Sequence, residues 1–275
     1  MSSNLHADDR TIAELTAFAG RLADASGPAI LPHFRSGAAI ENKLNDGFDP
    51  VTAADKAGER TIRVLIEETY PDHGILGEEY GTKDAGGPWR WVLDPVDGTR
   101  AFISGLPLWT TLIALDYEGA PALGLIDQPF TGERWSAAGD EARYARRGEP
   151  ARKIACSRQR RLADAIVSTT DPRPEAYFSP AEADAFAAVA RRARLARFGL
   201  DAYAYAMLAH GEIDLVIETG LQPYDFHAHV PIVRAAGGVI TDWRGGAEPT
   251  GAQVVAAASP ALLEEALAIL EPAAL

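Results

Sequence analysis

Apolar residues recur at helical spacing near the start of the chain. Between residues 11 and 34 they stand three or four positions apart, which marks one buried face of a helix. These positions are Ile12, Leu15, Phe18, Ala19, Leu22, Ile30 and Leu31. Gly27-Pro28 predicts a kink or a break, because proline lacks the N–H that a helix interior requires. A second helix is predicted from residues 51–55 to about Tyr70, with Thr52 as N-cap and Asp55 completing a capping box.

A continuous apolar run from Trp91 to Leu93 predicts a buried strand that stops at Asp94. Further strands are predicted at residues 108–116, 122–128 and 134–138, so the N-terminal half, 1–149, is interpreted as α+β. The C-terminal half, 150–275, alternates strands with helices, which favours an α/β unit on a mixed or parallel sheet. Its predicted strands are 166–170, 195–198, 215–218, 239–241 and 254–258, and its helices are 180–192, 203–210, 224–236 and one beginning at Ser259-Pro260.

Composition narrows the possible partners and the compartment. The 275 residues are 47% hydrophobic, which suits a globular protein with a sizeable core. The net charge of −13 argues against nucleic acids and anionic membranes as partners, since both require a basic surface. The single cysteine, Cys156, excludes an intramolecular disulfide, fits a reducing compartment and is predicted to lie in the core. With neither a signal-peptide pattern nor an apolar run of transmembrane length, we expect a cytoplasmic protein.

Candidate chemistry begins where the Trp91 strand is predicted to end. Asp94 and Asp97 lie three residues apart on a turn that Pro95 and Gly98 constrain, so both carboxylates can face one point. Two close carboxylates repel each other unless a cation lies between them, and Mg²⁺ prefers such oxygen ligands. The helix predicted to open at Gly98-Thr99 would offer backbone N–H groups to a phosphate. An ordinary Asp-Pro and Asp-Gly surface turn is the alternative.

Two further carboxylates have two interpretations each. Glu78 belongs to a Glu-Glu pair, and such pairs usually lie on a solvated face, but a two-metal site would need a third carboxylate near Asp94. Asp55 either caps its helix or holds a catalytic water or metal. The spacing does not separate these roles.

Four ordered blocks resemble the inositol monophosphatase family of Mg²⁺-dependent phosphatases. They are the stretch from Asp49 to Asp55, Gly77-Glu78-Glu79, WVLDPVDGTRAF, and Tyr224-Asp225 followed by AAGG at 235–238. The resemblance covers nearly the whole chain. It implies a layered αβαβα sandwich of two halves, with the metal site between them, and a homodimer.

The resemblance also implies the metal ligands. Glu78, Asp94 and the Val96 carbonyl match the ligands of the tightest ion, and Asp94, Asp97 and Asp225 match those of a second. Asp49 and Asp55 match positions linked to a weaker third ion, so two or three Mg²⁺ are expected, with Mn²⁺ as a substitute.

The remaining roles follow from the same resemblance. Backbone N–H groups of Gly98 and Thr99 would bind the phosphate. The Thr99 hydroxyl and Asp55 would orient and deprotonate the attacking water, with Glu78 as the third catalytic residue. Lys43 would supply positive charge to the substrate.

The substrate prediction rests on residues 199–205 and 218–225. In this chain they read GLDAYAY and ETGLQPYD, and they resemble the histidinol-phosphate phosphatase branch of the family. Asp201 and Glu218, with Asp97 nearby, would pair with the ammonium and imidazole of histidinol phosphate. Alternatively, Asp201 only caps the following helix, and the substrate is inositol-1-phosphate or another sugar phosphate.

The residues also raise two further possibilities, a non-catalytic protein and a zinc site. A phosphometabolite-binding protein without activity, built on the same fold, is the third functional hypothesis. The pair His227 and His229 suggests zinc, but residues two apart on a helix point to different sides, so joint ligation is not expected.

Overall fold

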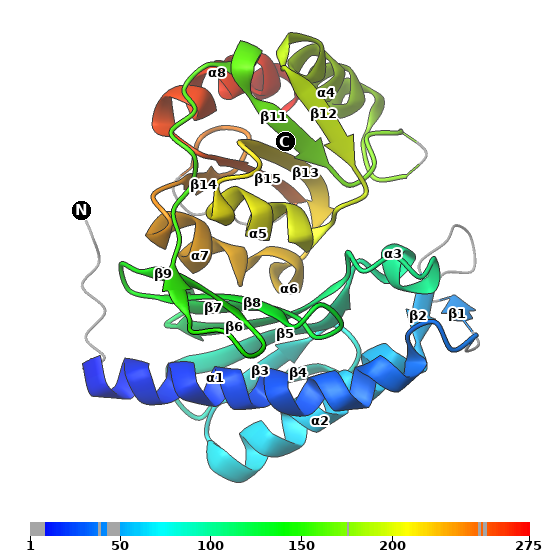
Figure 1. The fold of residues 1–275 in the computed structure, drawn as a ribbon, viewed down its shortest axis with the longest axis vertical. Coiled ribbons are helices and arrows are strands. Elements are labelled where there is room, and N and C mark those ends of the chain that lie inside the picture. Colours follow the sequence, from blue (N-terminus) through cyan, green and yellow to red (C-terminus); the bar gives the residue numbers. More distant parts are fainter. Residues whose placement is uncertain (1–8, 38–39, 43–49, 175, 247–248, 250–251) are drawn as a thin grey trace.

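The computed structural model describes residues 9–37, 40–42, 50–174, 176–246, 249 and 252–275. Lys43 and Asp49 lie outside the described residues. Five layers stack in the order helix, sheet, helix, sheet, helix (Figure 1). The predicted αβαβα sandwich is therefore confirmed. No helix of the described part of the chain is both long and apolar enough to cross a membrane.

The first layer contains α1 (Asp9–Ile30) and α2 (Ala53–Thr69), which pack against each other and against one face of the large sheet. Of the kink or break predicted at Gly27-Pro28, the break is wrong: α1 continues to Ile30 with Pro28 inside it, and a 3₁₀ turn, η1 (Leu31–His33), follows. Ile30 is fully buried, and its packing favours continuation of the helix despite the missing proline N–H.

The capping box predicted for α2 is confirmed. Thr52 Oγ1 accepts a hydrogen bond from Ala54 N at 3.1 Å, and Thr52 N donates to Asp55 Oδ2 at 2.8 Å. A two-stranded ribbon of β1 (Ile40–Asn42) and β2 (Pro50–Thr52) leads into this helix.

The second layer is an eight-stranded sheet in which only β3 and β5, among the described strand pairs, run parallel. Its order is β10 (Arg152–Lys153), β9 (Ala142–Arg146), β8 (Glu133–Ala138), β7 (Ala120–Gln128), β6 (Thr110–Tyr117), β5 (Trp89–Asp97), β3 (Gly74–Gly77) and β4 (Gly81–Lys83). The predicted end of β5 at Asp94 is wrong. Strand β5 continues to Asp97, pairing Asp94 with Leu112 and Asp97 with Thr110. The pairing is irregular between Asp94 and Asp97, because Pro95 has no N–H for the ladder.

The upper half is built on a five-stranded mixed sheet, as predicted. Its order is β12 (Leu195–Phe198), β11 (Ile166–Thr169), β13 (Leu215–Leu221), β15 (Ala252–Ala257) and β14 (Val239–Thr241). The 3₁₀ turn η2 (Leu162–Asp164) precedes β11. The outer face is covered by α4 (Pro180–Arg192), α8 (Pro260–Leu270) and η3 (Glu271–Ala273). A division of the chain near residue 150 stays a prediction.

Between the two sheets lie α5 (Ala202–His210), α6 (Pro223–Phe226) and α7 (His229–Ala235). The single helix predicted at 224–236 is wrong, because the chain turns at His227 and Ala228. That turn brings His227 Nδ1 within 2.9 Å of the buried Asp116 carboxylate on β6. Cys156 is buried in the core cluster around these helices, as predicted, and burial raises the pKa of its thiol to about 12.

Candidate active site

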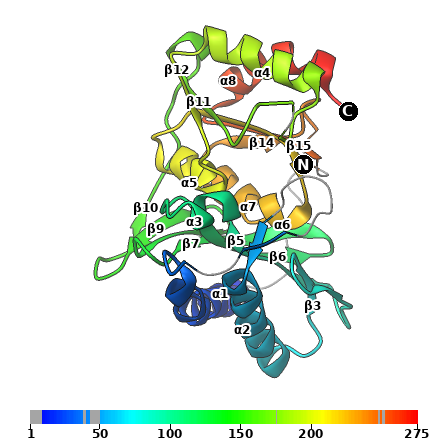
Figure 2. The same cartoon turned by 90° about the vertical axis from the view of Figure 1, so that its right-hand side faces the viewer.

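A cavity of about 470 Å³ opens where the two halves of the sandwich meet. The short helix α3 (Thr99–Ile103), which follows β5, lies at this junction below α5 (Figures 1 and 2). Carboxylates from both halves line the cavity. They are Glu78, Asp94, Asp97, Asp201, Glu218 and Asp225.

The segment from β5 into α3 forms the floor of the candidate metal site. Asp94 Oδ1 accepts a hydrogen bond from Val96 N at 2.9 Å, and the Thr99 hydroxyl donates to the Val96 carbonyl at 3.1 Å. Gly98 is the N-cap of α3 with φ of +79°, a conformation that glycine adopts without steric strain. The predicted helix start at Gly98-Thr99 is therefore confirmed.

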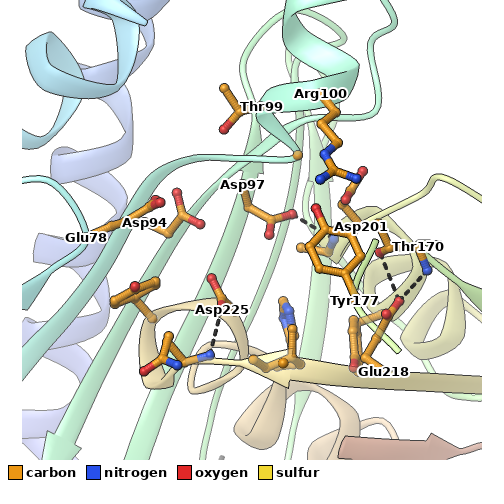
Figure 3. A pocket seen from close by; sticks show the side chains of 18 of the residues that line it. Glu78, Asp94, Asp97, Thr99, Arg100, Thr170, Tyr177, Asp201, Glu218 and Asp225 are labelled. Carbon is orange, nitrogen blue, oxygen red and sulfur yellow. Dashed lines mark hydrogen bonds between the residues drawn. The ribbon is translucent and has the colours of Figure 1, made fainter. Parts of the chain in front are cut away.

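Three carboxylates converge on one point. One oxygen each from Asp94, Asp97 and Asp225 lies within 4.8 Å of the others, and Figure 3 shows the three side chains turned toward one another. Asp225 is held by the backbone of Gln222, whose N–H donates to Asp225 Oδ2 at 2.6 Å. Oxygen donors at this density fit a hard divalent cation, because repulsion between the carboxylates is relieved by positive charge.

Burial and repulsion act together on these groups. Burial, and then the charge of Glu78, raise the pKa of Asp94 well above its ordinary value. The pKa of Asp97 is likewise raised, first by burial and then by Asp201. Metal-free, the cluster therefore has a strong affinity for positive charge, whether protons or a cation.

Glu78 and Asp55 approach the cluster from the α2 side. Glu78 lies beside Asp94 in Figure 3 and lines the cavity. Asp55 is 1% exposed and does not line it; its Oδ2 accepts from both the backbone and the hydroxyl of Thr52. Burial, as the largest cause, raises the pKa of Asp55, and the charge of Glu78 contributes. The cap role of Asp55 is thus confirmed, and its role toward water stays a prediction.

Asp201 and Glu218 occupy the opposite side of the cavity. Asp201 stands at the N-cap position of α5, but its side chain makes no capping hydrogen bond. Asp97 takes that role from the other half of the molecule, since its Oδ2 accepts from Ala202 N at 2.7 Å. The alternative that Asp201 merely caps the helix is therefore wrong.

Glu218 is a satisfied but strongly buried carboxylate. It accepts hydrogen bonds from Thr170 N at 2.8 Å and from the Thr170 hydroxyl at 3.0 Å (Figure 3). Burial, followed by the charge of Asp201, raises the pKa of Glu218 to about 8, and burial raises the pKa of Asp201 to about 6. The ionised form of both carboxyl groups is therefore unfavourable on this side of the cavity, and the Arg100 charge partly offsets this at Asp201.

Several cavity residues were not assigned a role from the sequence, among them Arg100, Tyr177, Tyr205 and His229. The Arg100 guanidinium lies 4.5 Å from the centre of the Tyr177 ring, at the rim. Tyr205 and His229 stack with ring centres 4.2 Å apart, and His229 is fully buried. Arg100 follows Thr99 directly, Tyr205 ends the 199–205 stretch and His229 belongs to the His227 and His229 pair, so these three carried a usable signal, whereas Tyr177 lies in a segment with no recognisable motif. His227 and His229 face different partners, so the expectation against joint ligation is confirmed.

The raised pKa values predict a pH-dependent stability for the metal-free protein. A carboxylate whose pKa is higher in the folded state stabilises the fold at low pH and loses that contribution as pH rises through the folded value. In EDTA, we expect Tm to fall from about pH 6.5 to about pH 8, because Glu218 loses its stabilising contribution until pH passes its folded pKa of about 8. Burial lowers the pKa of His229 to about 3, so its contribution makes the fold more stable as pH rises, but only up to its ordinary pKa near 6.5. Differential scanning fluorimetry checks this, and a flat or rising Tm in that window would contradict it.

Comparison with known proteins identifies the family. The profile of the inositol monophosphatase family matches residues 11–273. The chain belongs to this family. It is 41% identical over 274 residues to the chloroplastic bifunctional phosphatase IMPL2 of Arabidopsis thaliana, covering 96% of this chain and 77% of that protein. It is 34% identical over 225 residues to a histidinol-phosphatase of Chlorobaculum parvum, covering 82% of this chain and 84% of that protein.

The fold comparison agrees. A solved inositol monophosphatase from Zymomonas mobilis has a TM-score of 0.82 at 38% identity, covering 94% of this chain and 98% of that one. The resemblance inferred from four sequence blocks is confirmed, and the chain is a phosphatase of the inositol monophosphatase family. The convergent carboxylates agree with the metal dependence of that family.

Proposed function

We propose that this phosphatase is a Mg²⁺-dependent phosphomonoesterase that hydrolyses L-histidinol phosphate to L-histidinol and phosphate in histidine biosynthesis. The observation that carries the proposal is a second group of carboxylates in the same cavity. Asp201 and Glu218 line the cavity but do not belong to the cluster of Asp94, Asp97 and Asp225. A pair of buried carboxylates is matched by a leaving group with an ammonium and an imidazole. Inositol carries only hydroxyl groups.

Most of the proposed catalytic residues would bind metal ions. Glu78, Asp94, Asp97, Asp225 and the Val96 carbonyl would hold two Mg²⁺ ions. Asp49 and Asp55 would hold a weaker third ion, and Mn²⁺ would substitute. Bound Mg²⁺ would supply charge neutralisation and lower the pKa of water in phosphoryl transfer.

Proton transfer and phosphate binding would fall to the chain itself. The Thr99 hydroxyl, now donating to the Val96 carbonyl, and the Asp55 carboxylate would orient the attacking water and accept its proton. The backbone N–H groups of Gly98 and Thr99 would bind the phosphate oxygens. Lys43 would add positive charge, and Asp97 would contact the substrate from beside Asp201, whose charge acts on it.

Further proposals concern the setting of the enzyme. We propose a cytoplasmic homodimer that acts on a small phosphate monoester, with the two halves of each chain, 1–149 and 150–275, contributing to one site. The cavity supports the last point, because Asp94 and Asp97 come from the first half, and Asp201, Glu218 and Asp225 from the second.

The second candidate substrate is inositol-1-phosphate or a broader range of sugar phosphates. The observation that favours it is the 38% identity to the Zymomonas mobilis protein, which is named an inositol monophosphatase. That protein matches over nearly the whole chain, so its substrate is a reasonable competitor.

A direct comparison of substrates tests the proposal. We expect Mg²⁺-dependent phosphate release from L-histidinol phosphate with a kcat/KM at least about 100-fold above that for inositol-1-phosphate, the discrimination that one or two charge-assisted contacts supply. EDTA should stop release from both. Preference for inositol-1-phosphate would reject the histidinol-phosphate proposal, and activity that EDTA leaves unchanged would reject the metal dependence.

A further inference from the structure

The turn that carries Glu78 is fastened to α2 by a buried charge. Glu59 on α2 is fully buried, although it is a carboxylate. Its Oε2 accepts a hydrogen bond from Glu79 N at 2.7 Å, and its Oε1 accepts from Tyr80 N at 3.1 Å. These are consecutive backbone N–H groups of the turn between β3 and β4, directly after Glu78.

A second residue of α2 completes the attachment. Arg63 Nε donates to Glu59 Oε1 at 2.7 Å, one helical turn away, and Arg63 Nη2 donates to the carbonyl of Gly81. The contact is close: a side chain at Gly77 would overlap the Glu59 carboxylate. A buried carboxylate is stable only when donors satisfy it, so its bonds fix the backbone that supplies those donors.

The same helix also holds Asp55 at its first turn. Helix α2 is therefore a common support for two carboxylates, because its N-terminus fixes Asp55 and Glu59 fixes the turn of Glu78. The charge of Glu78 acts on the pKa of both Asp55 and Asp94, so the three groups lie within electrostatic range.

We propose that Glu59 is a positioning residue for the metal site: it holds the turn after β3 so that Glu78 faces Asp94. This inference rests on the proposed role of Glu78 as a metal ligand. Glu59 itself does not line the cavity.

The test is Mg²⁺ binding to the metal-free full-length protein by isothermal titration calorimetry, with Glu59→Gln beside wild type. Glutamine keeps the size of the side chain but loses its charge. It also turns an amide donor toward either the backbone N–H groups or Arg63. We expect the Mg²⁺ Kd to rise about 10-fold, the usual size of effect when a partner that orients a metal ligand is lost. The Mg²⁺ concentration for half-maximal activity should rise in parallel, while kcat at saturating Mg²⁺ stays within about twofold of wild type.

Two further variants make the result specific. Glu68→Gln, an exposed position on the same helix, is the matched control and should bind Mg²⁺ like wild type. Arg63→Gln removes the ion pair but leaves the carboxylate, so it should raise the Kd in the same direction by a smaller factor. If circular dichroism shows that Glu59→Gln is unfolded, the Mg²⁺ Kd of Arg63→Gln tests the proposal instead.

The outcomes separate this inference from the proposed function. If folded Glu59→Gln binds Mg²⁺ as tightly as wild type, the positioning role is wrong although the metal site stands. If Glu59→Gln does not fold and Arg63→Gln binds like wild type, the positioning role is also wrong. If wild type itself binds no Mg²⁺, the proposed metal site fails first.

Discussion

Replacing Asp94 with asparagine should abolish phosphate release while leaving the fold intact. Asp94 lies between Glu78 and Asp97, and in the proposed metal site its charge would help to hold the cation. We expect kcat to fall by about 1,000-fold or more, the loss typical of removing one electrostatic element from a preorganised site. Steady-state phosphate release at saturating Mg²⁺ measures this.

Stability provides the internal check on this variant. Burial and neighbouring charges raise the pKa of Asp94, so the ionised side chain destabilises the metal-free fold. In EDTA, Asp94→Asn should therefore melt at or above the wild-type Tm, and added Mg²⁺ should raise its Tm less than that of wild type. The exposed Asp84→Asn is a matched control that should behave like wild type in both assays. Full activity of Asp94→Asn would overturn the metal assignment.

Replacing Asp201 with asparagine should change which substrate the enzyme prefers. Asp201 lies beside Gly98, with its carboxylate 3.2 to 3.3 Å from where a Cβ of that glycine would stand, so it borders the proposed phosphate site. Loss of one charge-assisted contact to the substrate ammonium should lower kcat/KM for histidinol phosphate by about 10- to 100-fold. The kcat/KM for inositol-1-phosphate should stay within about threefold, because a hydroxyl forms an equally good hydrogen bond with asparagine.

The ratio of the two kcat/KM values is the informative quantity. A loss of stability or of metal affinity would lower both values together, whereas a role in recognising the leaving group lowers only one. Asp201 also raises the pKa of Asp97, so its removal lowers the negative charge beside the cluster, and both substrates are therefore assayed at saturating Mg²⁺. Equal losses on both substrates would therefore contradict the assignment of Asp201 to substrate recognition.

Local sequence signals determined much of the framework. The capping box of α2, the start of α8 at Ser259-Pro260 and the start of α3 at Gly98-Thr99 depend on neighbouring residues alone, and all are present in the structure. The bounds of α4, β12 and β14 agree with the predicted ones for the same reason. The ordered motifs also determined the family, since its carboxylates occupy fixed places in the chain.

Only the tertiary structure decided how distant residues share the site. Local spacing predicted Asp201 as a possible cap, but the carboxylate that accepts from Ala202 N at the start of α5 is that of Asp97, 105 residues before Ala202. The helix predicted at 224–236 is divided at His227, whose partner Asp116 lies on another layer. Likewise, the sequence leaves the paired glutamates between a solvated face and a metal site, whereas in the structure their turn is bound to the buried Glu59 of α2. Hydrogen bonds within a few residues are set by the local sequence, whereas partners from separate layers are set by how the layers pack.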